Sequence, residues 1–153
     1  HVSSTAIRHL LESGETIKAA ALLGSEYTLS GEVVKGKKLG RELGYPTANI
    51  KPDSEFKLIP AIGVYAVTAE TDGTEYFGMM SIGKNPTVTD NESIKIEVNL
   101  FDFDREIYGS KIKIKFTEYI RDEKKFDNVN ELKDQMANDK LKTEEIFSRL
   151  KIN

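Results

Sequence analysis

The hydrophobic pattern of the chain changes its period twice and divides it into three parts. Residues 3–24 follow a helical period, with glycines at positions 14 and 24 placed to end two short helices. Residues 27–119 alternate between apolar and polar positions, which is the period of half-buried strands. The remainder returns to a helical period. The pattern therefore predicts a β-rich body with helical segments on both sides of it in sequence.

The middle part is typical of antiparallel structure. Asp72-Gly73, between two alternating runs, is a strong signal for a two-residue hairpin turn. Several alternating strands separated by Gly, Asp and Asn favour an antiparallel barrel or sandwich. The clearest apolar positions are Ile94, Ile96, Val98 and Leu100 in one run, and Ile112, Ile114 and Phe116 in another.

The last part predicts two helices. Asn128 and Glu131 fit a capping box that starts the first helix, and Thr143 is placed to open a second one. The apolar residues at helical spacing are Val129, Leu132 and Met136 in the first, and Ile146, Phe147 and Leu150 in the second.

Composition narrows the chemistry. The 153 residues, 39% hydrophobic and 31% charged, suit one globular domain with a hydrophobic core. A net charge of -3 gives no electrostatic reason to expect nucleic acid or an anionic membrane as partner. No apolar run approaches a membrane span, and the first residues do not resemble a signal peptide, so we expect a cytoplasmic protein.

Two residue types are scarce. The absence of cysteine excludes disulfides, thiolate metal sites and cysteine nucleophiles. The only histidines are His1 and His9, at the beginning of the chain. Proton transfer elsewhere must therefore fall to a carboxylate, a lysine or a tyrosine.

The richest stretch for chemistry is Gly31–Ile50, which combines glycines with cationic side chains. Gly31, Gly36 and Lys37 fit most of a P-loop, but Lys38 stands where that motif has its magnesium-binding hydroxyl. The P-loop interpretation therefore fails. A solvated basic loop and a phosphate-binding loop both remain open at this point.

Thr47 and Asn49 follow Pro46 in what should be an extended segment, so they point to the same side. A hydroxyl and an amide carbonyl are hard oxygen ligands suited to Mg²⁺ that bridges nucleotide phosphates. Ordinary turn hydrogen bonding is the alternative, and the residues alone favour it. The neighbouring groups that could face phosphate are Gly36, Gly40, Gly44, Lys37, Lys38 and Arg41.

The stretch resembles the riboflavin kinase (flavokinase) signature, with its Gly-Arg-x-x-Gly-aromatic-Pro-Thr-Ala-Asn core intact from Gly40 to Asn49. Segments 60–67, 81–87, 96–98, 102–109 and 120–126 agree with the family in the same order. The resemblance implies Mg²⁺-dependent transfer of the ATP γ-phosphoryl group to the 5′-hydroxyl of riboflavin, giving FMN and ADP. It also implies a six-stranded antiparallel Greek-key barrel with C-terminal helices.

The resemblance assigns roles by matched position. Thr47 and Asn49 would bind Mg²⁺, and Glu97 would accept the hydroxyl proton. The residues alone favour a different interpretation, in which Glu97 is a surface carboxylate paired with Lys95 or with a lysine of a neighbouring strand. The ATP and phosphate contacts implied are Gly36, Lys38, Gly40, Arg41, Gly44, Tyr45 and Thr47, and a flavin and phosphate loop would use Arg121 and Phe126.

Residues 2–8 resemble an ATP-binding motif of the FMN adenylyltransferase domain, which precedes the kinase in bacterial bifunctional FAD synthetases. A well-capped helix explains the same residues. The resemblance divides the chain into residues 1–24, a helical remnant or linker of that domain, and residues 25–153, the kinase domain. We therefore expect FAD synthesis only of the full-length parent, whose adenylyltransferase domain would be this chain's covalent partner.

Two alternatives stay open. A non-catalytic flavin- or nucleotide-binding barrel would need neither the base nor the metal ligands. A nucleic-acid module is suggested only by the strand-like row Lys111, Lys113 and Lys115, which alternates with isoleucines rather than with stacking aromatics.

Overall fold

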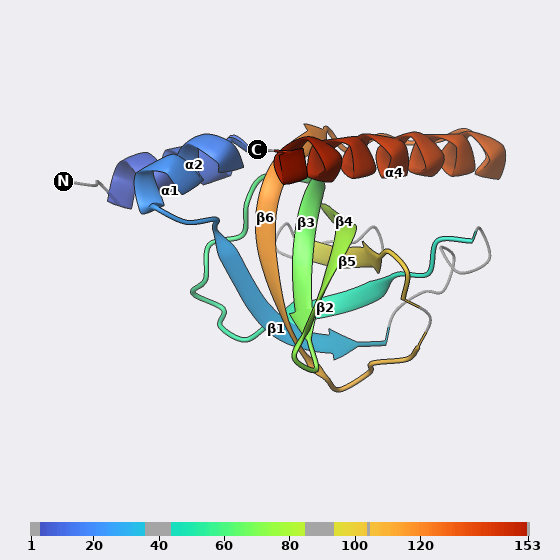
Figure 1. The fold of residues 1–153 in the computed structure, drawn as a ribbon, viewed down its shortest axis with the longest axis horizontal. Helices are drawn as coiled ribbons and strands as arrows, with labels where there is room; N and C mark the ends of the chain where they lie inside the picture. Colours follow the sequence, from blue (N-terminus) through green and yellow to red (C-terminus); the bar gives the residue numbers. More distant parts are fainter. Residues whose placement is uncertain (1–3, 36–43, 85–93, 104, 153) are drawn as a thin grey trace.

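The computed structural model describes residues 4–35, 44–84, 94–103 and 105–152. Its centre is a closed barrel of six antiparallel strands in the order β1-β2-β5-β4-β3-β6, with β6 pairing back onto β1 (Figure 1). The strands are β1 (Thr28–Val34), β2 (Ala48–Pro52), β3 (Gly63–Thr71), β4 (Thr74–Lys84), β5 (Ile94–Leu100) and β6 (Lys111–Arg121). Consecutive strands β3, β4 and β5 are neighbours and β6 lies beside β3, which is a Greek-key order. The predicted barrel is confirmed.

The barrel interior is filled by the apolar side of the predicted alternation. Ile96, Val98 and Leu100 of β5 are buried there, as are Ile112, Ile114 and Phe116 of β6. The ring of Tyr65 meets that of Phe116 edge-on at 5.2 Å between centroids. Each fully buried side chain of this size contributes about 1.5–3 kcal/mol relative to an exposed one.

The β3–β4 connection is the predicted hairpin. Thr71 pairs with Thr74, which leaves a two-residue loop. Asp72 and Gly73 have φ angles of 52° and 74°, the left-handed conformation that a type I′ turn requires at both positions.

The two N-terminal helices end where the glycines predict. α1 (Ser4–Glu12) and α2 (Thr16–Leu23) are followed by Gly14 and Gly24, with φ angles of 79° and 82°. Leu11 is buried, its carbonyl accepts a hydrogen bond from the N–H of Ala61 at 3.0 Å, and α2 contacts β6. These helices are therefore attached to the barrel.

The C-terminal part is one helix, α4 (Val129–Ile152), and not the two predicted. Its start is as expected, since Asn128 Oδ1 accepts a hydrogen bond from the N–H of Glu131 at 2.9 Å. Thr143 is not a cap but lies buried in mid-helix, where its hydroxyl donates to the carbonyl of Asp139 at 2.8 Å. No Gly or Pro between residues 129 and 152 interrupts the helix.

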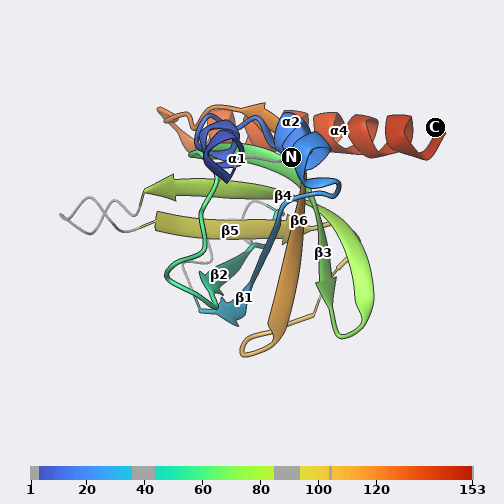
Figure 2. The ribbon, with the colours of Figure 1, turned by 90° about the vertical axis from the view of Figure 1, so that its left-hand side faces the viewer.

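The helices α1, α2 and α4 lie on the same side of the barrel, with α4 running across it (Figure 2). The C-terminal half of α4 is held by apolar packing: Ile146 and Phe147 contact Ala66, Phe77 and Ile120, and the rings of Phe77 and Phe147 stack at 4.2 Å. Its N-terminal half is left to form the wall of a pocket.

Within the described residues, none of the helices has both the length and the apolar character needed to cross a lipid bilayer.

Candidate active site

A single row of cross-strand partners runs around the outer face of the barrel and carries most of the candidate site. Asn49 of β2 is paired with Glu97 of β5, and Glu97 is paired with Ser81 of β4. The row continues through Val64 of β3 to Arg121, the last residue of β6. Because paired residues in adjacent strands share a face, the predicted metal ligand and the predicted base lie side by side.

Glu97 has a separate partner for each carboxylate oxygen. The hydroxyl of Thr47 donates to Oε2 at 2.9 Å, and the ammonium of Lys95 lies 2.9 Å from Oε1. The Glu97 side chain is 24% exposed and that of Lys95 29%. The pairing with Lys95, expected of a surface carboxylate, and the proximity to Thr47, expected of a catalytic one, therefore occur together.

The donor set fits a divalent cation held mainly by substrate phosphates. A hydroxyl has one proton and two lone pairs, so Thr47 can donate to Glu97 and still offer oxygen to a cation. Asn49 adds an amide carbonyl on the adjacent strand position. Among the described residues no cluster of three or more His, Asp or Glu side chains could hold a metal by itself.

The segment that carries Thr47 is fixed by a buried amide that the sequence analysis did not single out. Asn99 is 6% exposed, and its Nδ2 donates to the carbonyl of Pro46 at 2.6 Å. Gly44, at the start of this segment, has a φ of 85°. The available signal was the position of Asn99 two residues after Glu97, on the same side of the strand.

Two pockets meet at Thr47, which lines both. The first, of about 300 Å³, lies between the outer row and α4; the second, of about 370 Å³, lies beside the 103–108 segment. The first is lined by Thr47, Val64, Met79, Met80, Ser81, Lys95, Glu97, Asn99, Arg121, Glu123, Lys124, Phe126, Leu132, Met136 and Asp139. The second is lined by Val33, Pro46, Thr47, Ala48, Val98, Leu100, Phe103, Arg105, Glu106, Ile107 and Tyr108.

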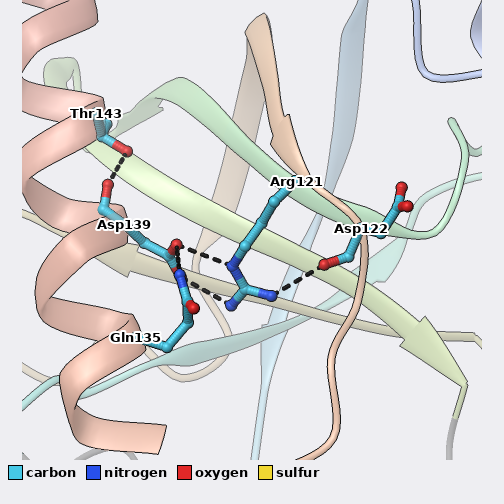
Figure 3. Close-up of polar contacts among 5 residues, drawn as sticks. All are labelled: Arg121, Asp122, Gln135, Asp139 and Thr143. Carbon is cyan, nitrogen blue, oxygen red and sulfur yellow. Dashed lines mark hydrogen bonds and ion pairs between the residues drawn. The ribbon is translucent and has the colours of Figure 1, made fainter. Parts of the chain in front are cut away.

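Arg121 lines the first pocket but is already bound to α4 (Figure 3). Its Nε and Nη2 each lie 2.8 Å from an oxygen of Asp139, and Nη1 donates to the carbonyl of Asp122 at 2.9 Å. Gln135 donates to the same carboxylate of Asp139 at 2.9 Å. A bidentate pair of this kind fixes orientation, so Arg121 holds the N-terminal half of α4 over the pocket.

Phe126, predicted for the flavin loop, lines the first pocket, and two further phenylalanines stand at positions 101 and 103. The ring centroid of Phe126 lies 6.0 Å from the Arg121 guanidinium carbon. Phe103 lines the second pocket and meets Tyr76 edge-on at 4.9 Å. Phe101 lies below the ammonium of Lys140, at 5.3 Å.

Of the remaining predicted contacts, Tyr45 lies within the described residues and the others do not. Tyr45 is half-buried next to Pro46. Gly36, Lys38, Gly40 and Arg41 lie outside the described residues, as does the 85–87 part of the family resemblance. Their roles stay predictions.

The lysine row on β6 is partly neutralised. Lys111 forms an ion pair with Asp53 at 2.9 Å, and Lys115 forms one with Glu75 at 3.1 Å. The hydrogen bond to Asp53 raises the pKa of Lys111, and the one to Glu75 raises that of Lys115. Two of the three charges that suggested a nucleic-acid surface therefore have carboxylate partners.

Fold and site together define a class: a closed six-stranded barrel with one pocket on its outer face and a second lined partly by core residues, the two meeting at Thr47, whose hydroxyl is hydrogen-bonded to Glu97. The chain belongs to the riboflavin kinase family, because the flavokinase (riboflavin kinase) family model matches residues 23–147.

Several known proteins resemble the chain over most of its length. The chain is 44% identical, over 97% of its length, to 47% of the bifunctional riboflavin kinase/FMN adenylyltransferase of Listeria monocytogenes. The crystal structure of a Streptococcus pneumoniae protein titled macrolide-efflux protein matches 94% of this chain with 46% of its own, at a TM-score of 0.88 and 40% identity. Riboflavin kinase from Trypanosoma brucei shares the fold, with a TM-score of 0.56, 24% identity and 79% of each chain covered. The chain spans about half the length of the curated relatives it matches.

Proposed function

We propose that this chain is a riboflavin kinase in activity as well as in family, transferring the γ-phosphoryl group of ATP to the 5′-hydroxyl of riboflavin. The observation that carries the proposal is the 2.9 Å hydrogen bond from Thr47 to Glu97. It joins the predicted metal ligand to the predicted base across fifty residues of sequence. A barrel that only bound a flavin or a nucleotide would not need these two groups in contact.

The two pockets divide the substrates between them. Glu97 lines the first pocket, so the hydroxyl that gives up its proton belongs there, and the flavin ring would contact Met136 and Phe126. ATP would then occupy the second pocket, on the other side of Thr47. The phosphoryl group would cross from one pocket to the other at Thr47.

In the proposed phosphoryl transfer, one bond to Pγ forms as another breaks, and Glu97 takes the proton. The 5′-oxygen of riboflavin forms a bond to Pγ as its proton passes to the Glu97 carboxylate. The bond from Pγ to the β,γ-bridging oxygen breaks, and its electron pair leaves with ADP. Thr47 and Asn49 are the residues that would hold Mg²⁺, which when bound neutralises charge on the phosphates.

Incubation of the protein with riboflavin, ATP and Mg²⁺, followed by chromatographic detection of FMN, tests the proposal. Wild-type protein should form FMN, and Glu97→Gln should form it at least about 100-fold more slowly while still binding riboflavin. Glu75→Gln is the matched control, because Glu75 is a strand carboxylate paired with a lysine and lining neither pocket. If folded wild-type protein forms no FMN, the kinase proposal is rejected. The non-catalytic flavin- or nucleotide-binding barrel then remains as the explanation.

The relatives are also FMN adenylyltransferases by name, and they are about twice as long as this chain. We propose for residues 25–153 the kinase reaction only, with residues 1–24 as the helical linker to an adenylyltransferase domain and the cytoplasm as location. The same assay supplied with FMN and ATP should yield no FAD. FAD from this chain would contradict the division.

A further inference from the structure

Lys95 is the group next to the site to which the family resemblance gives no role. It lies two residues before Glu97 in β5, so both side chains leave the strand on the same face. Its ammonium does not extend into solvent but turns along the strand to Glu97 Oε1. Both residues line the first pocket.

The setting of this ion pair differs from that of the strand lysines on β6. Lys111 and Asp53 are 72% and 44% exposed, and Lys115 and Glu75 are 34% and 49% exposed. Of these three pairs, only Lys95 and Glu97 are both less than a third exposed. Exposed pairs contribute about 0–1 kcal/mol to stability, and partial burial adds a desolvation penalty. Stability alone is therefore a weak reason for an ion pair at this depth in a pocket wall.

We propose that Lys95 is a positioning residue for phosphoryl transfer, holding Oε1 of Glu97 so that Oε2 stays directed at Thr47 and the incoming hydroxyl. This inference rests on the proposed kinase function. Glu97 has several rotatable bonds, and the two contacts at 2.9 Å hold its carboxylate from both ends. Lys95 keeps its protons throughout, and the proton from riboflavin goes to Glu97.

The contact predicts a specific kinetic signature. If Lys95 acts through Glu97, its loss should lower kcat while the KM values for riboflavin and ATP change little. An arginine at position 95 keeps the positive charge and a hydrogen-bond donor at similar reach. It should therefore restore most of kcat, because the role of the side chain is to hold one oxygen of Glu97. A lysine that bound substrate directly would instead act mainly on KM.

The experiment compares Lys95→Met, Lys95→Arg and the control Lys115→Met in the FMN assay. Lys115 is also a strand lysine paired with a glutamate, but it lines neither pocket. Lys95→Met should lower kcat by about 10- to 100-fold, with both KM values within about threefold of wild type. Lys95→Arg should recover to within about fivefold, and Lys115→Met should match wild type.

Three kinetic results would overturn the proposal: an unchanged kcat in Lys95→Met, a change confined to KM, or an equal loss in Lys115→Met. A crystal structure of Lys95→Met gives a readout that does not depend on activity. The Glu97 carboxylate should leave hydrogen-bond distance of Thr47, and its staying in place would also overturn the proposal. Absence of FMN from wild-type protein would reject the proposed kinase function. The crystal structure of Lys95→Met would still show whether Lys95 positions Glu97.

Discussion

The two faces of β5 show how one strand can serve stability on one side and chemistry on the other. Its inner face places Ile96, Val98 and Leu100 in the barrel core, and Val98 and Leu100 also line the second pocket. Its outer face places Lys95, Glu97 and Asn99 along the first pocket. The inner residues are interchangeable in kind, because any apolar side chain of similar volume fills the core. The outer residues act through individual atoms, so each is expected to tolerate little change in chemistry.

The largest expected effect on stability tests the inner face. Ile96→Ala removes a side chain that is 3% exposed and leaves a cavity inside a closed barrel. The free energy of unfolding should fall by about 2–5 kcal/mol, measured by urea denaturation. The KM for riboflavin, measured below the unfolding transition, should stay near the wild-type value. A loss below about 1 kcal/mol would show that the inner face is not well packed.

Glu97→Gln tests the outer face in the opposite sense. The FMN-forming rate should fall by about 100- to 10,000-fold, because an amide cannot accept the hydroxyl proton. The thermal midpoint should stay within about 3 °C, since the side chain is on the outer face and its pairs are only partly buried. A large loss of stability with normal activity would reverse the assignment of the two faces.

Asn99→Ala tests a residue that combines properties of both faces. Asn99 is polar and on the outer side of β5, but it is buried like the core residues. Loss of its bond to the Pro46 carbonyl should lower the free energy of unfolding by about 1–3 kcal/mol and also lower kcat, because Thr47 lies next to that carbonyl. Chemical denaturation and the FMN assay measure the two effects. A stability loss with unchanged kcat would make Asn99 purely structural.

Ile94→Ala is expected to give the smallest effect, and it tests how far the hydrophobic core extends along β5. Ile94 has the same strand parity as Ile96 but is 40% exposed at the end of β5. Its replacement should change the free energy of unfolding by less than about 1 kcal/mol in the same denaturation assay. An effect as large as that of Ile96→Ala would extend the core to the strand end.

Much of the fold could be predicted because it depends on local periods. Alternation over 94–100 and 112–116 predicted strands correctly, and Asp72-Gly73 predicted the hairpin, since both signals depend on short-range geometry. The continuity of α4 was missed because Thr143 reads locally as a cap. Whether its hydroxyl caps a helix or bonds within one depends on the chain before it, which contains no helix breaker.

The site was less accessible than the fold for a different reason. The family resemblance brought Thr47, Asn49 and Glu97 into consideration, but only the pairing of β2 with β5 puts them next to one another. Likewise, the charge run after Arg121 gives no sign that this arginine binds Asp139 in α4. Contacts between residues far apart in sequence require the three-dimensional order of the strands, which periodicity does not contain.

The closure of the barrel has a consequence for how the protein behaves at high concentration. Because β6 pairs back onto β1, each of the six strands has a neighbour on both sides. An open sheet would present a row of unpaired N–H and C=O groups to which strands of other molecules could add. Within the described strands every edge has a partner over at least part of its length, so the outer face can display an open pocket to small molecules with fewer free strand edges than an open sheet would have.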